Sequence, residues 1–216
     1  MALRAARALT DAGRLPLAGW RNGSGHLVFT VVWLVLILSA GQSLAESRQP
    51  ADDAVARLAS GDVLLLRHAL APGFGDPDNF RVDDCATQRN LDDRGREQAR
   101  SIGDWLRARG IDRADVYSSQ WCRCLETAEL LDLGPVKPLS GLNSFFQRTA
   151  DRAPNLAGLR RFLAERGPAD TPLVLVTHQV TISALTGLFA DSGGGVVATL
   201  GPQGELADFA RIDFDD

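Results

Sequence analysis

Two runs of aliphatic residues dominate the hydrophobic pattern of the chain. Residues 62–68 (DVLLLRH) and 172–178 (PLVLVTH) are apolar almost without interruption, and each run ends in a histidine. A continuous pattern of this kind is typical of strands that are buried on both faces, as in parallel sheets. Shorter strands are predicted at 114–119 (ADVYSS) and 136–139 (VKPL).

Amphipathic segments alternate with these strands. Residues 91–110 have apolar positions at helical spacing, an aspartate at the expected N-cap and Gly110 beyond the end, so they predict a helix. Further helices are predicted at 122–133, 156–167 and 179–190, and a hairpin at 195–214 around the turn GPQGE. Strands that alternate with helices predict a layered α/β fold with a largely parallel sheet.

Residues 69–90 form no recognisable element. This stretch is rich in Gly, Pro, Asp and Asn and has a cysteine near its end. Loops of this length inside a compact domain are usually functional or disordered. The cysteine suggests that this loop is tied to the rest of the fold.

The first 45 residues have the composition of an export signal. Four arginines precede an apolar run from Leu27 to Leu38, which is too short for a comfortable membrane span, and small residues follow at Ser43 and Ala45. We expect cleavage after Ala45, and an uncleaved N-terminal anchor is the alternative. In both cases residues 46–216 would form one domain outside the cytosol, in the periplasm or secreted, with membrane contact only through an uncleaved signal.

Charge excludes one class of partner. The chain has 23 Lys+Arg and 27 Asp+Glu, so removing the four arginines and one aspartate of residues 1–45 leaves 19 against 26, a net charge of −7. A nucleic-acid partner requires a basic face, which this composition does not supply. We therefore expect no nucleic acid, and any bound anion must be held by a few arginines in a local pocket.

Three cysteines, Cys85, Cys122 and Cys124, allow at most one internal disulfide. Side chains two residues apart diverge on a helix or strand, which argues against a bond between Cys122 and Cys124. We expect a Cys85–Cys122 disulfide with Cys124 as a buried free thiol, as suits an oxidising compartment. Three reduced cysteines are the alternative.

Polar side chains follow three of the predicted strands. Arg67 and His68 end the first long run, Ser118 and Ser119 lead from the next strand to Arg123, and His178 ends the last. Ligands of open α/β sheets bind beyond the carboxyl ends of the strands, so these groups should meet at one rim. A cation in the first turn of a helix, such as Arg123, opposes the helix dipole, which favours an anionic partner.

Three blocks of sequence resemble the signature of a known family. LLRHALAPG, SSQWCRCLETA and VLVTHQVTISALTG, with LDDRGREQA between the first two, are similar to the motifs of the histidine phosphatase superfamily, the phosphoglycerate mutase-like fold. The resemblance runs from about residue 62 to about residue 190, and it implies a three-layer α/β sandwich with a mostly parallel central sheet. DDCATQRNL together with SSQWC further resembles an exported bacterial subgroup.

The resemblance also implies roles for particular residues. His68 would be the nucleophile, phosphorylated transiently on a ring nitrogen, while Arg67, Arg123 and His178 would hold the phosphoryl oxygens. Neutral imidazole is a good nucleophile near neutral pH, and the planar fork of arginine suits phosphate. Phosphoryl transfer mainly needs positioning and charge stabilisation, so we expect no metal and no cofactor. Arg89 is a candidate pocket residue.

The sequence departs from the family where a proton donor is expected. Ser144 stands where many members have a glutamate, Gln179 stands where another branch has an aspartate, and Ala69 replaces a common glycine. A general acid contributes about 10²- to 10⁴-fold in rate. Asp76, Asp83 or Asp84 of the long loop is a candidate replacement, since the Cys85–Cys122 bond would hold that loop beside Arg123.

The function predicted is a phosphatase acting on a small phosphorylated substrate or a phosphorylated envelope component, as a phosphoric monoester or phosphoramidate hydrolase. Cysteine-based phosphatases need an arginine six residues after the cysteine, and those positions hold Leu91 and Ala128. No P-loop, nucleophile elbow or zinc spacing is present. The serious alternative is a non-catalytic envelope module that binds a phosphorylated ligand, because the usual acid is missing.

Overall fold

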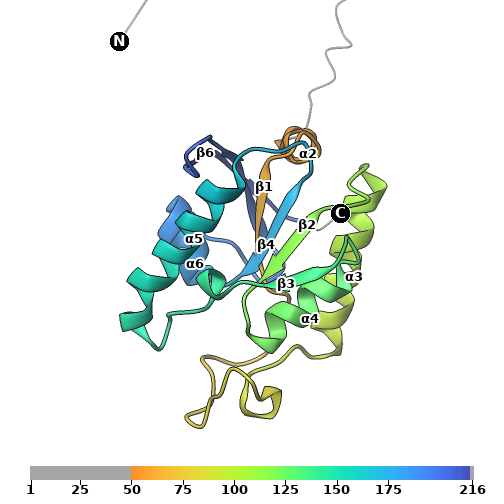
Figure 1. Cartoon of the computed structure of the whole chain (residues 1–216). Coiled ribbons are helices and arrows are strands. Elements are labelled where there is room, and N and C mark those ends of the chain that lie inside the picture. Colours follow the sequence, from red (N-terminus) through yellow and green to blue (C-terminus); the bar gives the residue numbers. More distant parts are fainter. Residues whose placement is uncertain (1–49, 215–216) are drawn as a thin grey trace, which may run out of the picture. The chain divides into compact units, whose positions relative to one another are not determined.

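The computed structural model describes residues 50–214, which build a six-stranded sheet in the order β3-β2-β4-β1-β5-β6 (Figure 1). Strands β1 to β4 are mutually parallel, β5 runs antiparallel to β1, and β6 forms the predicted hairpin with β5 at the edge. The predicted mostly parallel α/β sheet is therefore confirmed. The strands are β1 Val63–Arg67, β2 Asp115–Ser118, β3 Val136–Pro138, β4 Leu173–Thr177, β5 Gly195–Leu200 and β6 Leu206–Ile212.

Helices cover both faces of the sheet (Figure 1). Helices α3 and α4 lie on one face, and α5 and α6 lie on the other. Within residues 50–214, no helix is long and apolar enough to cross a membrane. The expected signal segment, 1–45, lies outside the described residues. The helices are α2 Pro50–Ala59, α3 Asp93–Ala108, α4 Cys122–Leu130, α5 Arg152–Arg166 and α6 Gln179–Thr186, with short 3₁₀ turns η1 Cys85–Thr87, η2 Ser140–Leu142 and η3 Thr149–Asp151.

The uninterrupted apolar pattern of the central strands has a direct cause. Leu64 and Leu66 of β1 belong to the core beneath α3 and α4, whereas Val63 and Leu65 belong to the core beneath α5 and α6. Successive side chains of a strand point to opposite faces, so a sheet covered on both sides needs apolar residues at every position. All four of these side chains have no exposed surface.

Several helix boundaries differ from the sequence prediction, and one helix was not predicted. The helices predicted at 91–110 and 122–133 are shorter, as α3 Asp93–Ala108 and α4 Cys122–Leu130. Helix α5 begins at Arg152 rather than at 156, and Pro154 occupies its first turn, where proline is tolerated because the N–H it lacks has no partner there. Helix α6 ends at Thr186 rather than at 190, because Gly187 adopts a left-handed conformation (φ 73°) that closes the helix. Helix α2 was not predicted, although Asp52 and Asp53 in its first turn are a start signal.

The register of the parallel strands brings their carboxyl ends to one edge. Arg67 of β1 pairs with Thr177 of β4, and Ser118 of β2 pairs with Val176 of β4. The next residues continue this alignment, because the His68 backbone N–H donates to the Thr177 carbonyl (3.0 Å) and that of Ser119 donates to the Val176 carbonyl (2.9 Å). The polar groups that follow the three strands therefore meet at this edge.

Candidate active site

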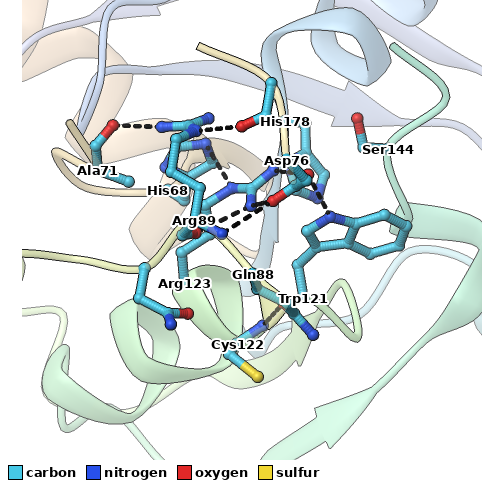
Figure 2. A network of polar contacts seen from close by, with 12 residues as sticks. His68, Ala71, Asp76, Gln88, Arg89, Trp121, Cys122, Arg123, Ser144 and His178 are labelled. Atoms are coloured by element: carbon cyan, nitrogen blue, oxygen red, sulfur yellow. Dashed lines mark hydrogen bonds and ion pairs between the residues drawn. The ribbon is translucent and has the colours of Figure 1, made fainter. Parts of the chain in front are cut away.

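A cavity of ≈ 300 Å³ opens at the carboxyl edge of the sheet. Its lining includes the two imidazoles and two guanidiniums that the sequence singled out, together with Asp76 and Arg89 of the loop 69–90. Figure 2 shows side chains of this site converging from separate segments of the chain. The charged and titratable residues that line the cavity are Arg67, His68, Asp76, Arg89, Arg123 and His178.

His68 is held with one ring nitrogen unprotonated. Its Nδ1 lies 2.7 Å from the carbonyl oxygen of Ala69, which can only accept, so Nδ1 carries the proton and Nε2 carries a lone pair. Arg123 Nε–H donates to that Nε2 at 3.2 Å. Burial, followed by the positive charge of Arg123, lowers the pKa of His68 to about 3. His68 is therefore a neutral imidazole with its lone pair on Nε2 at neutral pH.

Arg123 is one of the most constrained charges in the described part of the chain. It is 3% exposed, and its terminal nitrogens Nη1 and Nη2 donate to the two carboxylate oxygens of Asp76 at 2.6 and 3.1 Å, while Nη1 also donates to the Arg89 carbonyl at 3.1 Å. A guanidinium has five N–H donors in a fixed plane. Asp76 accepts from the terminal edge of this plane, where one hydrogen of Nη1 and one of Nη2 point the same way. On the neighbouring edge of the guanidinium, Nε–H donates to His68 Nε2, and the second hydrogen of Nη2 lies on the same edge.

Asp76 comes from the long loop and accepts four hydrogen bonds from this cluster. Besides those from Arg123, its carboxylate accepts from Trp121 Nε1 (3.0 Å) and from the Arg89 backbone N–H (3.1 Å). Burial by itself raises the pKa of Asp76, but the hydrogen bonds and charge of Arg123 outweigh this effect, and the pKa is lowered. Asp76 is therefore an anion in this arrangement.

The two other candidate acids of the loop lie elsewhere. The Asp83 side chain is 77% exposed and lies near Arg81, and the Asp84 side chain accepts the Ala86 backbone N–H at the start of η1. Neither residue lines the cavity. The structure brings Asp76 to the site and leaves Asp83 and Asp84 outside it.

Two further guanidiniums approach the cavity. Arg67 Nη1 donates to the Ala190 carbonyl at 3.0 Å, while its buried Nε has no hydrogen-bond partner in the described structure. An unpartnered buried donor is unusual, and this N–H is available to an acceptor that enters the cavity. Arg89 donates through Nε to the Gly75 carbonyl (2.8 Å) and through Nη1 to the Ala71 carbonyl, so it stabilises the loop that carries Asp76.

His178 lies opposite His68, with ring centroids 5.4 Å apart. Its Nε2 is 2.9 Å from Ser119 Oγ, which donates its single hydrogen to Asn143 Oδ1 at 3.2 Å and therefore accepts from the His178 ring. Ser119 is thus part of a chain of hydrogen bonds that orients His178. Burial, followed by the charge of Arg123, holds the pKa of His178 well below its ordinary value, so this ring is also neutral at neutral pH.

The positions where relatives have a proton donor hold other groups. Ser144 lines the cavity, and its Oγ accepts the Phe146 backbone N–H at 3.3 Å. The Gln179 side chain donates to Ser183 Oγ (2.7 Å) and accepts the Ala190 backbone N–H (2.9 Å), so its amide stabilises the end of α6. Thr177 Oγ1 donates to the Leu142 carbonyl at 2.7 Å and stabilises the end of β4.

The long loop is fastened at the site. The structure contains the Cys85–Cys122 disulfide, which joins η1 to the first residue of α4, next to Arg123. Gln88 Oε1 accepts the Cys122 backbone N–H at 2.9 Å beside this bond. Cys124 is a buried free thiol, and burial raises its pKa to about 12, so it is not a thiolate nucleophile.

Sequence reasoning missed three residues that shape the site. Trp121 donates to Asp76, Gln88 stabilises the start of α4, and Asn143 orients Ser119. Trp121 and Gln88 lie in blocks that carry the family resemblance, but only tertiary contacts assign their partners. Within residues 50–214, no cluster of three or more His, Cys, Asp or Glu could hold a metal ion.

Comparison with known proteins agrees with this geometry. Residues 63–145 match the sequence model of the histidine phosphatase superfamily (branch 1), a segment that includes Arg67, His68, Arg89 and Arg123. The resemblance to the histidine phosphatase superfamily is confirmed. A search of curated proteins found no match to the chain.

A search of solved structures also found matches to this chain. A structure titled mycobacterial hydrolase 1 is 18% identical over 70% of this chain and 96% of its own, with a TM-score of 0.51. The protein histidine phosphatase SixA in complex with tungstate is 19% identical over 69% and 96%, with a TM-score of 0.48. Phosphoglycerate mutase from Thermus thermophilus is 16% identical over 70% and 99%, with a TM-score of 0.46.

Proposed function

We propose that this protein is a phosphatase that transfers the phosphoryl group of its substrate to His68 and then to water. One observation carries the proposal. The unprotonated Nε2 of His68, which accepts from Arg123 Nε–H, belongs to a ring that lines the cavity together with Arg67, Arg89 and Arg123. A neutral nucleophile beside several guanidiniums suits a dianionic phosphate ester.

In the first step, the Nε2 lone pair forms a bond to phosphorus while the bond between phosphorus and the ester oxygen breaks. The electrons of that bond leave with the oxygen, and the proton on Nδ1 stays on the ring. The Ala69 carbonyl, 2.7 Å from Nδ1, stabilises the positive charge that the phosphorylated ring acquires. A covalent intermediate divides one difficult displacement into two easier ones.

In the second step, a water oxygen attacks phosphorus and the electrons of the N–P bond return to Nε2. The products are neutral His68 and dihydrogen phosphate, which retains both protons of the water. Charge stabilisation comes from arginines throughout, so the proposal includes no metal ion.

Arg123 suits this reaction because of how it is oriented. Its Nε–H, which donates to Nε2 in the free protein, becomes available to a phosphoryl oxygen once Nε2 bonds to phosphorus. Its Nη2–H on the same side supplies the second donor of a bidentate contact. The unpartnered Nε of Arg67 supplies another donor.

The test is hydrolysis of 4-nitrophenyl phosphate by the purified protein and by the His68→Ala variant. We expect turnover that persists in EDTA and is lost in the variant, and an acid-labile, alkali-stable phosphoryl adduct in rapidly quenched wild type. A phosphate-binding module is the second candidate, favoured by Ser144 at the acid position. It would bind phosphate without His68-dependent release.

The proposal also includes export. The Cys85–Cys122 disulfide is compatible with an oxidising compartment, and the composition of residues 1–45 is that of a signal segment. We therefore infer that the protein acts in the periplasm or outside the cell.

A further inference from the structure

Three phenylalanines with exposed rings surround the cavity. The described part of the chain has five exposed large hydrophobic residues, and three of them line this cavity: Phe74 (87% exposed), Phe146 (46%) and Phe189 (54%). They come from the loop 69–90, from the segment after η2, and from the connection between α6 and β5. Single exposed hydrophobic residues are normal, but a group of them around a pocket marks a binding surface.

The rings are arranged around the phosphate-binding end. Phe74 and Phe146 pack edge to face with centroids 5.0 Å apart, and the guanidinium carbon of Arg67 lies 5.9 Å from the centroid of Phe189. Glycines flank Phe74 on both sides, and both adopt positive φ (Gly73 98°, Gly75 68°). This turn presents the Phe74 ring to the cavity mouth instead of to the core. A phosphoryl group bound by Arg67 would have its ester substituent among these rings.

Among the described residues that line the same cavity, none is a free carboxylic acid or imidazolium that could protonate the leaving group, because His68 and His178 are buried and neutral. Asp76 is an anion paired with Arg123, and the Gln179 amide is engaged with α6 and Ala190. The Ser144 hydroxyl, whose oxygen accepts from Phe146, is too weak an acid to replace a carboxylic acid. The ester oxygen must therefore depart as an anion.

Departure as an anion favours substrates whose leaving group is a weak base. A phenol has a pKa of about 10, whereas an alkoxide is about as basic as hydroxide, whose conjugate acid, water, has a pKa of about 15.7. Only the phenolate leaves readily without a proton. An apolar aliphatic ester could contact the phenylalanines, but its alkoxide would leave slowly.

We propose that the substrates are aryl phosphate monoesters, of which the phosphotyrosine side chain is the representative. This inference rests on the proposed phosphatase function and specifies its substrate class. The substrate ring packs against Phe74, Phe146 and Phe189, and its phosphate reaches His68. The first step yields the phosphorylated His68 and a phenolate, which takes its proton from water after release.

The first experiment compares substrates on the wild-type protein. Phosphotyrosine, phosphoserine, a long-chain alkyl phosphate and phosphoramidate are assayed for phosphate release, each with the His68→Ala variant as control. We expect kcat/KM for phosphotyrosine to exceed that for phosphoserine and the alkyl phosphate by about 100-fold or more, the lower end of what a general acid contributes.

The second experiment measures binding without turnover. Phenylphosphonate and methylphosphonate are titrated into the wild type and into Phe146→Ala, Phe189→Ala and Phe209→Ala. Phe209 is the matched control, because it is 38% exposed but lies on β6 and does not line the cavity. We expect phenylphosphonate to bind about tenfold more tightly than methylphosphonate, and each of the first two variants to reduce that ratio by about threefold.

The outcomes separate this inference from the proposed function. Equal or faster His68-dependent turnover of phosphoserine, the alkyl phosphate or phosphoramidate would overturn the aryl class and leave the phosphatase intact. No His68-dependent release from any compound would overturn the phosphatase. Equal binding of the two phosphonates, or an equal effect of Phe209→Ala, would show that the phenylalanines do not form an aryl site.

Discussion

At the scale of single residues, the ion pair between Arg123 and Asp76 decides what the site can do. Asp76 accepts from the two terminal nitrogens of the guanidinium, Nη1 and Nη2, and leaves Nε–H to donate to His68. The carboxylate has the geometry of a positioning group, because the pairing keeps it ionised and fixes the plane of Arg123. The loop acid expected from the sequence would instead need a proton to donate.

We predict that Asp76→Asn lowers kcat/KM for 4-nitrophenyl phosphate by about tenfold. An amide has one acceptor oxygen and no charge, so one charge-assisted hydrogen bond to Arg123 is lost, an interaction of about 1.5–3 kcal/mol. Steady-state kinetics on esters whose leaving groups differ in basicity distinguishes a positioning role of Asp76 from a general-acid role. A positioning group lowers all rates by a similar factor.

Matched controls come from the same loop. Asp83→Asn and Asp84→Asn remove carboxylates that do not line the cavity, so both should stay within about twofold of wild type. A loss in Asp76→Asn that grows with the basicity of the leaving group would instead identify Asp76 as the general acid.

At the scale of elements, the loop 69–90 depends on its covalent attachment. It supplies Asp76 and Arg89 to the cavity, yet within it only the three residues of η1 are regular structure. The Cys85–Cys122 bond closes a segment of 37 residues and attaches the loop to the helix that carries Arg123. The disulfide thus holds the two sides of the Arg123–Asp76 pair near each other.

We predict that the double variant Cys85→Ser/Cys122→Ser is less stable than wild type by about 2–4 kcal/mol, because it loses a cross-link that restricts the unfolded chain. Urea unfolding measures this difference. Dithiothreitol should destabilise the wild type similarly and leave the double variant unchanged. Alkylation of unfolded, unreduced wild type should label one of the three cysteines, and three labelled thiols would contradict the disulfide.

At the scale of the whole molecule, burial of two neutral histidines links stability to pH. His68 and His178 are 2% and 3% exposed, and the pKa of each is lowered in the folded protein, that of His68 to about 3. Unfolding returns both to an ordinary pKa of about 6.5. As the pH falls below about 6.5, the unfolded chain binds protons that the folded protein does not, so stability decreases toward pH 3.

We predict that the free energy of unfolding falls more steeply between pH 6 and pH 5 in wild type than in His68→Asn. One proton taken up only on unfolding corresponds to about 1.4 kcal/mol per pH unit, and the variant lacks that proton. Urea unfolding at several pH values measures both slopes. Equal slopes would mean that His68 is already protonated in the folded protein or not buried as described.

Much of the scaffold was predictable because it depends on local pattern. The apolar runs before His68 and His178 predicted strands buried on both faces, and parallel strands must align their carboxyl ends. This pattern was enough to place Arg67, His68, Arg123 and His178 at one edge of the sheet. Helix α2 and the first turn of α5 were missed, and both begin with turns that lack large apolar side chains.

The sequence by itself determined how strands and helices follow one another along the chain from residue 62, the identity of the groups at their ends and the absence of glutamate or aspartate at 144 and 179. Tertiary structure alone decided that Asp76 and not Asp83 pairs with Arg123, that Nδ1 of His68 bonds the Ala69 carbonyl, and that three distant phenylalanines share one cavity. The physical reason is the separation in sequence between the residues that interact. Strand and helix patterns repeat every few residues along the chain, whereas partners of loop side chains are chosen by packing between segments far apart in sequence.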